Sequence, residues 1–294
     1  MALFVQHVID ATTYGSLFAL YALGIALIFG IMGLINFAHG ELIMVGGYTI
    51  VLLAHPPWPV VILATIAVAI VFALAMERVA FRPLRGASPP TLLIASFAVS
   101  YGLQNLAILI EGSAAKGVSV STWLSESFQI GSVSIPKLDV VTVAVTAVLL
   151  VSLGLFLQRT RIGVQMRAAA EDFRIARVLG VKANTVIATA FAISGLLAGV
   201  GAYFLTAQTG EVTPDFGSNP VLYAFVATVL GGMGTLRGAV LGGYVFGAIF
   251  VALQAYLPIE LAPYRDAFAY GAVIVMLLVR PQGLVVSRSV VTRI

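Results

Sequence analysis

Three residues with side chains suited to proton or solute chemistry lie close together in a strongly apolar part of the sequence. They are Asn36, His39 and Glu41, within the stretch INFAHGELIMVGGY at positions 35–48. Across residues 11–54, Glu41 is the only Asp, Glu, Lys or Arg. A carboxylate and an imidazole can take up and release protons, and an amide can both donate and accept hydrogen bonds. What these groups do depends on the elements that hold them.

The composition places the chain in a membrane. Of its 294 residues, 60% are hydrophobic and 10% are charged, whereas soluble domains carry about 25% charged residues. The excess apolar surface must face lipid, so the backbone must satisfy its own hydrogen bonds in helices or in a closed barrel. The apolar runs are long and do not alternate, which indicates helices. We expect one all-α transmembrane bundle over residues 1–294, whose first apolar segment stays as a span.

Nine apolar segments are long enough, or nearly long enough, to cross a bilayer. A straight crossing needs about 20 residues, so the second and the seventh segments are short. Each lies next to glycine-rich sequence and is typical of a broken or half-crossing helix. We expect eight or nine spans, at residues 10–34, 40–54, 59–79, 89–110, 138–158, 185–207, 219–234, 238–257 and 264–280.

The distribution of positive charge predicts the orientation of the chain. With the N-terminus outside and the C-terminus inside, all but three of the 16 Lys and Arg residues fall in inner segments; the exceptions are Lys116, Lys137 and Arg265. This asymmetry satisfies the positive-inside rule. The net charge of +4 is therefore attributed to membrane topology, and no nucleic-acid partner is expected.

The sequence of each of the two longest loops predicts a secondary-structure element within that loop. In the outer loop, 111–137, the stretch FQIGSVSI alternates apolar and polar residues around Gly131 and Ser132 and predicts a small hairpin. In the inner loop, 159–184, apolar residues recur in steps of three and four. They predict one short amphipathic helix, which Gly180 is placed to end. Its apolar face consists of Met166, Ala169, Ala170, Phe173, Ala176 and Leu179.

This inner helix has two interpretations. It can anchor to anionic lipid, or it can couple the spans to a cytoplasmic ATPase by docking in a groove of that protein. The mixed charges favour coupling, because a lipid anchor would carry mostly Lys and Arg. In addition, Arg167, Glu171 and Arg174 are spaced to pair across helical turns. The candidate coupling residues are Arg167, Glu171, Asp172, Phe173, Arg174, Arg177 and Gly180.

Two glycine pairs predict close helix packing. Gly195 and Gly199 stand in a G-x-x-x-G on the sixth segment, and Gly243 and Gly247 do the same on the eighth. Small residues let helix backbones approach closely in lipid.

Signatures of catalysis are absent from the sequence. It contains no HExxH, GxSxG or P-loop motif. It has no cysteine, and its three histidines are scattered. We therefore expect no enzymatic activity, no bound cofactor and no metal site, and any ATP hydrolysis must occur on another protein.

The residues around Glu41 also have two interpretations, which differ in depth. In the first they form a turn at the membrane surface, where Asn36 caps the second span, Glu41 complements the helix dipole, and His39 pairs with Glu41. In the second the turn lies inside the bundle, and its polar groups line a route or a gate. Ionisable groups at membrane depth are costly and usually functional. The sequence leaves both interpretations open.

Four stretches of the chain resemble the permeases of branched-chain amino-acid ABC transporters, the LivH-like group. The first is INFAHGELIMVGGY. The second begins RIGVQMRAAAEDFRIARVLGV and continues into the sixth segment, the third is VLGGMGTLRGAVLGG, and the fourth is VMLLVRPQGL near the C-terminus. Their order and spacing match that group over essentially the whole chain, except in the outer loop 111–137.

The resemblance implies a protein of the bacterial inner membrane that works with partners. These would be a second, homologous permease subunit in a heterodimer, two cytoplasmic ATPase subunits that bind ATP and Mg²⁺, and a periplasmic binding protein that delivers Leu, Ile or Val. Relatives of this group also carry amides, so a related small amino acid or amide is a further possible solute. The resemblance gives the inner segment 159–184 the coupling role.

Two other classes of function fit parts of the sequence. A proton-coupled secondary transporter would use Glu41 and His39, but such carriers usually need several buried ionisable groups. A solute channel would conduct without ATP and would not need the inner amphipathic helix. Replacing Glu41 by Gln, or deleting residues 165–180, separates these classes from an ABC permease.

Overall fold

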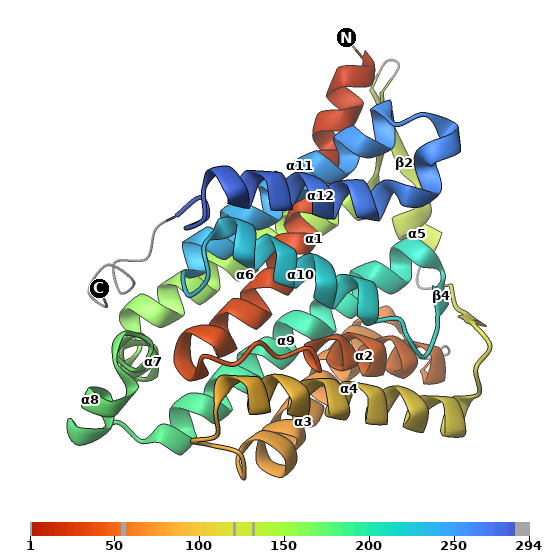
Figure 1. The fold of residues 1–294 in the computed structure, drawn as a ribbon. Helices are drawn as coiled ribbons and strands as arrows, with labels where there is room; N and C mark the ends of the chain where they lie inside the picture. The colour runs from red at the N-terminus through yellow and green to blue at the C-terminus, as the bar shows by residue number, and fades with distance from the viewer. Residues whose placement is uncertain (1, 54–56, 120–121, 131–132, 286–294) are drawn as a thin grey trace.

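A computed structural model describes residues 2–53, 57–119, 122–130 and 133–285 of the chain as a helical bundle (Figure 1). Within these ranges, seven helices are long and apolar enough to cross a membrane. They are α1 (Ala2–Met32), α3 (Trp58–Met76, continued by the π turn Glu77–Phe81), α4 (Pro89–Glu111), α6 (Lys137–Arg159), α9 (Ala183–Thr209), α11 (Leu236–Tyr256) and α12 (Arg265–Val279, preceded by the 3₁₀ turn Ile259–Tyr264).

Two further apolar helices are too short to cross by themselves. They are α2 (His39–Leu52) and α10 (Ser218–Gly231), each of 14 residues. These nine helices coincide with the nine expected segments, so the all-α prediction and the positions of the apolar segments are confirmed. The two short helices are the second and seventh segments, as their lengths in the sequence indicated.

The ends of the helices alternate between two ends of the bundle. The first turns of α1 and α6 and the last turns of α9 and α11 line one cavity. The last turn of α1, the last turns of α6 and the first turn of α11 line a different cavity. Figure 1 accordingly shows the N-terminus beside β2 and far from α7 and α8. Following the charge asymmetry, we call the end with the N-terminus the outer end and the other the inner end.

The centre of the bundle consists of α1 and α9. In their most apolar stretches 83% and 67% of the residues are buried, against 6% in α4 and 11% in the span that ends with α12. Close approach to these two central helices is made possible by glycine. A Cβ atom added to Gly243 of α11 would lie 2.4 Å from the backbone nitrogen of Ala19 in α1, and one added to Gly247 would lie 2.5 Å from that of Gly15.

The other glycine pair brings α9 against α3. A Cβ atom on Gly195 would lie 2.7 Å from the carbonyl oxygen of Ala69, and one on Gly199 would lie 2.9 Å from the Cα atom of Ile66. Real Cβ atoms essentially never come so close to other atoms. Both G-x-x-x-G pairs therefore lie at helix contacts that leave no room for a side chain.

Short strands organise the outer end. In the outer loop, β2 (Ser127–Ile130) pairs antiparallel with β3 (Val133–Pro136) after the short helix α5 (Thr122–Ser125), so the predicted hairpin is confirmed. Its turn residues Gly131 and Ser132 lie outside the described residues. A second antiparallel pair joins β1 (Lys116–Gly117) to β4 (Glu211–Val212). This pair ties the outer loop to the segment that leads into α10.

Candidate functional site

The turn that contains the predicted site residues lies deep inside the bundle. The chain reverses at Gly33, whose φ is +65°, and returns along α1 before α2 begins. A Cβ atom on Gly24 of α1 would lie 2.5 Å from Cε1 of His39. Gly24 is eight residues before the end of α1 at Met32, which is about 12 Å along the helix. His39 is thus more than two helical turns away from the inner end of α1.

Burial of the three side chains contradicts the surface interpretation. Asn36 and His39 have no exposed area and Glu41 is 1% exposed. The N-cap of α2 is Ala38, and no side chain caps this helix. Asn36 precedes the N-cap by two residues; its carbonyl oxygen accepts from the His39 N–H at 3.2 Å, while its amide makes no hydrogen bond. The prediction that Asn36 caps α2 is therefore wrong.

The predicted pairing of His39 with Glu41 is also wrong. Residues two apart on a helix do not face each other, and the two side chains accordingly contact different helices. The Nδ1 atom of His39 lies 3.0 Å from Oγ of Ser194 in α9. On the other side of α2, Oε1 of Glu41 accepts from Ser100 Oγ at 2.7 Å and from Gln104 Nε2 at 2.8 Å, both in α4.

The same hydrogen-bond cluster includes the start of α10. The amide of Gln104 lies 3.2 Å from Oγ of Ser218, the first residue of α10. Glu41 occupies the first turn of α2, where a carboxylate suits the helix dipole. Polar contacts inside the bundle therefore connect α2, α4 and α10 at the point where both short helices begin.

The N-termini of α2 and α10 meet at two glycines. A Cβ atom on Gly217 would lie 1.8 Å from the carbonyl oxygen of Gly40, and one on Gly40 would lie 2.4 Å from the carbonyl oxygen of Gly217. From this point α2 runs towards the outer end, where Gly47 lies beside Val212. The helix α10 runs in the opposite direction, towards the inner end, where its last residue Gly231 packs against Gly238. Each short helix thus crosses half of the bundle.

Non-helical segments complete these two crossings. Residues 33–38 lead from the inner end to α2, and residues 211–217 lead from the outer end to α10. Non-helical backbone at membrane depth is tolerated only where it is buried in protein or lines a water-filled cavity. Residues 33–38 are largely buried, whereas residues 211–217 line a cavity.

That cavity, which we call the outer pocket, has a volume of about 420 Å³, within the range of small-molecule sites. One wall is formed by Tyr14, Leu17, Phe18 and Tyr21 of α1 and by Phe250 of α11. Its remaining lining comes from the end of α9, the 211–217 segment, the first turns of α10, and Arg265 at the start of α12.

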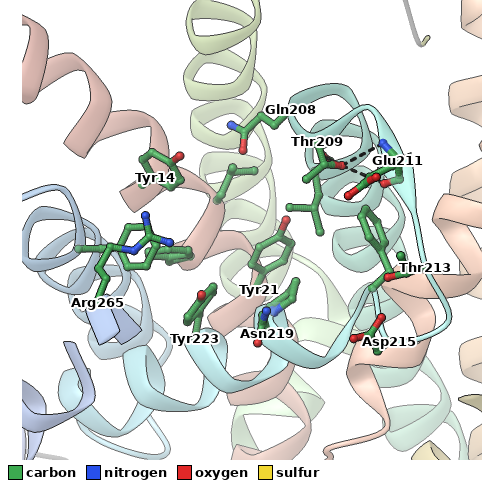
Figure 2. Close-up of a pocket in the computed structure, with 16 residues that line it drawn as sticks. Tyr14, Tyr21, Gln208, Thr209, Glu211, Thr213, Asp215, Asn219, Tyr223 and Arg265 are labelled. Carbon is green, nitrogen blue, oxygen red and sulfur yellow. Dashed lines mark hydrogen bonds between the residues drawn. The ribbon is translucent and has the colours of Figure 1, made fainter. Parts of the chain in front are cut away.

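Charged groups lie on opposite sides of the outer pocket. Figure 2 shows Arg265 on one side, Glu211 and Asp215 on the other, and Tyr21 and Tyr223 between them. None of these residues was among the site candidates from the sequence. The available signals were that Arg265 is one of three outer cations, and that the polar stretch TPDFGSNP precedes a short apolar segment.

The inner loop contains two helices instead of the one predicted. α7 (Arg161–Glu171) and α8 (Phe173–Val178) are separated at Asp172, where φ is −148° and ψ is 107°. The Asp172 carboxylate accepts from the N–H groups of Arg174 and Ile175 at 2.8 and 2.9 Å and so caps α8. The periodicity continues across this break, which is why the spacing of apolar residues concealed it.

The surface of α8 differs from the predicted apolar face. Ala176 is buried, whereas Val178 and Leu179 are 87% and 78% exposed. Gly180 ends α8 with a φ of +89°, and its N–H donates to the Arg177 carbonyl oxygen at 3.1 Å. The inner loop therefore presents apolar side chains, interspersed with Arg174 and Arg177, outside the bundle.

Contacts of α7 connect the inner loop to the central helix. Nε of Arg167 donates to the carbonyl oxygen of Leu157 in α6 at 3.0 Å, and no ion pair forms between Arg167 and Glu171, both of which the structure describes. A cavity of about 450 Å³ lies between α7, the last turns of α1 and the turn at 234–237. At one edge of this cavity the three elements come close, because a Cβ atom on Gly30 of α1 would lie 3.9 Å from both Cβ of Ala170 in α7 and the carbonyl oxygen of Gly234.

A bundle of apolar helices in which two half-crossing helices meet next to a cavity is typical of membrane transport proteins. The family described as "Branched-chain amino acid transport system / permease component" matches residues 8–278. The chain belongs to this family.

Individual relatives agree with this assignment over nearly their full length. The permease protein BraD of a high-affinity branched-chain amino acid transport system in Pseudomonas aeruginosa is 37% identical over 297 residues, covering 96% of this chain and 95% of that protein. The corresponding LivH proteins of Salmonella typhimurium and Escherichia coli K12 are 34% and 33% identical, with the same coverage.

Proposed function

We propose that the chain is the membrane-spanning permease subunit of an ATP-binding-cassette importer for branched-chain amino acids, or for related small amino acids or amides. The observation that carries this proposal is the family match over residues 8–278, together with relatives that are permease proteins of high-affinity branched-chain amino acid transport systems. The same observation favours an importer subunit over a proton-coupled carrier or a channel.

The proposal includes partners that supply energy and affinity. A second, homologous permease subunit forms a heterodimer with this chain in the inner membrane. Two ATPase subunits on the inner face bind ATP and Mg²⁺, and a periplasmic binding protein delivers the solute. This chain itself holds no cofactor and catalyses no reaction. The absence of a P-loop from the sequence supports this division of roles.

In this mechanism the inner loop transmits the motion of the ATPases. The exposed apolar side chains of α8 dock on the ATPase, and α7 passes the displacement to α1 and to the turn at 234–237, which line the same cavity. Rocking of these helices then alternates access between the outer pocket and the inner end. The half-crossing helices α2 and α10 lie where that change must occur, because both begin midway through the bundle.

Purification with partners tests this function. The chain is tagged at its C-terminus and isolated from its native host in mild detergent, and the associated proteins are identified. We expect two P-loop ATPase subunits and one further permease, with ATP hydrolysis that rises when the binding protein and leucine are added. An isolated chain without ATPase partners that still moves solute in vesicles would exclude the proposal.

A further inference from the structure

Arg265 has hydrogen-bonding capacity that its neighbours in the protein do not use. Its guanidinium lies over the ring of Phe250, with 4.1 Å between the guanidinium carbon and the ring centroid. Nη1 makes one long hydrogen bond, 3.5 Å, to Gln254, and Nε is buried without a hydrogen-bond partner. A guanidinium carries five N–H donors, so the remaining Nη1 and Nη2 donors have no hydrogen-bond partner within the described residues.

Stability of α12 does not account for a cation at this position. Arg265 is the first residue of α12, and positive charge at a helix N-terminus opposes the helix dipole. Asp266 follows it and forms an ion pair with it, with 3.6 Å between Nε of Arg265 and Oδ1 of Asp266, but no hydrogen bond joins them, and the other carboxylate oxygen accepts from the Tyr223 hydroxyl at 3.0 Å. The guanidinium therefore favours an anion in the pocket.

The wall next to Arg265 suits an aliphatic side chain. The ring of Phe18 lies 5.1 Å from that of Tyr223 and 5.5 Å from that of Phe250, measured between centroids. Phe18 and Phe250 are buried, with 3% exposure each. Hydrogen bonds to ionised groups are strengthened in such water-poor surroundings, so a carboxylate at Arg265 and an apolar group on these rings can be bound together.

The opposite side of the outer pocket has the opposite charge. Glu211 and Asp215 line it, and Figure 2 places them across the pocket from Arg265. A field of this polarity orients a dipolar ion with its carboxylate towards α12 and its ammonium group towards the 211–217 segment. This orientation by the field does not require a single solute molecule to contact both sides of the outer pocket.

We propose that the outer pocket is the entry site for an amino-acid zwitterion and that Arg265 recognises its carboxylate. This assignment rests on the proposed function. It deepens that function by naming the chemical group of the solute that the permease itself recognises. Because a binding protein supplies affinity in such a system, the site in the permease can be weak and still orient the solute as it enters.

Direct binding to the purified complex tests the assignment. The complete complex is placed in lipid nanodiscs without nucleotide or binding protein, and binding of labelled leucine is measured, with unlabelled leucine and leucinamide as competitors. Leucinamide lacks the carboxylate. We expect wild type to prefer leucine by about tenfold or more, because charge-assisted bidentate hydrogen bonds are the strong ones. Arg265→Gln should lose that preference, and Arg265→Lys should retain part of it.

Lys116→Gln provides a matched control. Lys116 is another outer cation, paired with Glu111, and its replacement should leave the preference unchanged. The proposal is overturned if wild type shows no saturable leucine binding, or if an assembled Arg265→Gln complex keeps the wild-type ratio of leucine to leucinamide affinity. Leucine uptake with the binding protein tests the proposed function separately. A complex that imports leucine and fails either binding criterion overturns only the pocket assignment.

Discussion

Glu41 is a carboxylate inside the bundle whose neighbours are neutral donors. Ser100 and Gln104 both donate to its Oε1 atom, and its Oε2 atom has no hydrogen-bond partner. Its side chain therefore connects α2 to α4, and through Gln104 to α10. In the proposed importer this role is positional, because ATP provides the energy.

Replacing Glu41 by Gln should therefore preserve transport. The amide oxygen can still accept from Ser100 and Gln104, so we expect ATP-dependent leucine uptake to stay within about tenfold of wild type, the equivalent of one net hydrogen bond. Glu41→Ala leaves both donors without an acceptor and should destabilise the complex by about 1–3 kcal/mol, measured as a lower Tm. Loss of uptake in an assembled Glu41→Gln complex with intact ATP hydrolysis would contradict the positional role and support proton transfer.

At the scale of elements, α2 and α10 depend on glycine at their point of contact. The backbones of Gly40 and Gly217 approach so closely that a Cβ atom added at either position would overlap the carbonyl group of the other residue. Two helices of 14 residues can meet in this way only if neither carries a Cβ atom there.

Gly217→Ala should consequently disrupt assembly of the permease. Its Cβ atom would lie 1.8 Å from the Gly40 carbonyl oxygen, a backbone atom that cannot rotate away. We expect a destabilisation of about 3 kcal/mol or more, beyond the usual cost of overpacking, measured as thermal stability and yield of the folded protein. Gly102→Ala in α4, where no atom lies within 4 Å, is the control and should be neutral or slightly stabilising. Equal stability of the two variants would refute the close approach.

A second prediction at the scale of elements concerns the exposed face of α8. Val178→Asp places a charge where 87% of an apolar side chain is exposed, so folding should be unaffected while docking on the ATPase is lost. We expect at least about a 30-fold weaker capture of the ATPase subunits, the effect of removing a central interface residue. Capture is measured by quantitative pull-down from membranes. Arg82→Ser, an exposed substitution outside the inner loop, should leave capture unchanged, and unaltered capture by Val178→Asp would exclude α8 from the interface.

The elements were largely predictable from sequence because each depends on neighbouring residues. Hydrophobicity over windows of a span located all nine apolar helices, and alternation located the hairpin β2–β3. The break at Asp172 was missed because the apolar period continues through it, although Asp before an apolar run is a frequent N-cap.

The site was less predictable because it depends on contacts between distant segments. The depth of Asn36 and His39 follows from the return of residues 33–38 along α1, and nothing in those six residues specifies that direction. The outer pocket brings Arg265 beside residues of α1 and α10, more than 40 positions away in the sequence. Such neighbours follow from the packing of the whole bundle.

At the scale of the molecule, the outer pocket and the cavity beside α7 lie towards opposite ends of the same central helix. α1 lines the outer pocket through Leu17 and Tyr21 and the inner cavity through Leu27 and Gly30. The peripheral α4 and α12 leave most of their apolar surface uncovered, which in the membrane must face lipid or, in the proposed heterodimer, the second permease subunit. An importer subunit needs this arrangement, because energy arrives at one end and solute at the other.

Transport by the reconstituted complex tests most directly the central claim, which is that the chain is a subunit of an ABC importer. The purified complex is placed in proteoliposomes with ATP inside the compartment that the ATPases face, and uptake of labelled leucine is followed with the binding protein on the opposite side. We expect accumulation that requires both ATP and the binding protein and does not respond to a proton gradient. Leucine accumulation driven by a proton gradient in the absence of ATP would contradict the assignment as an ABC importer subunit.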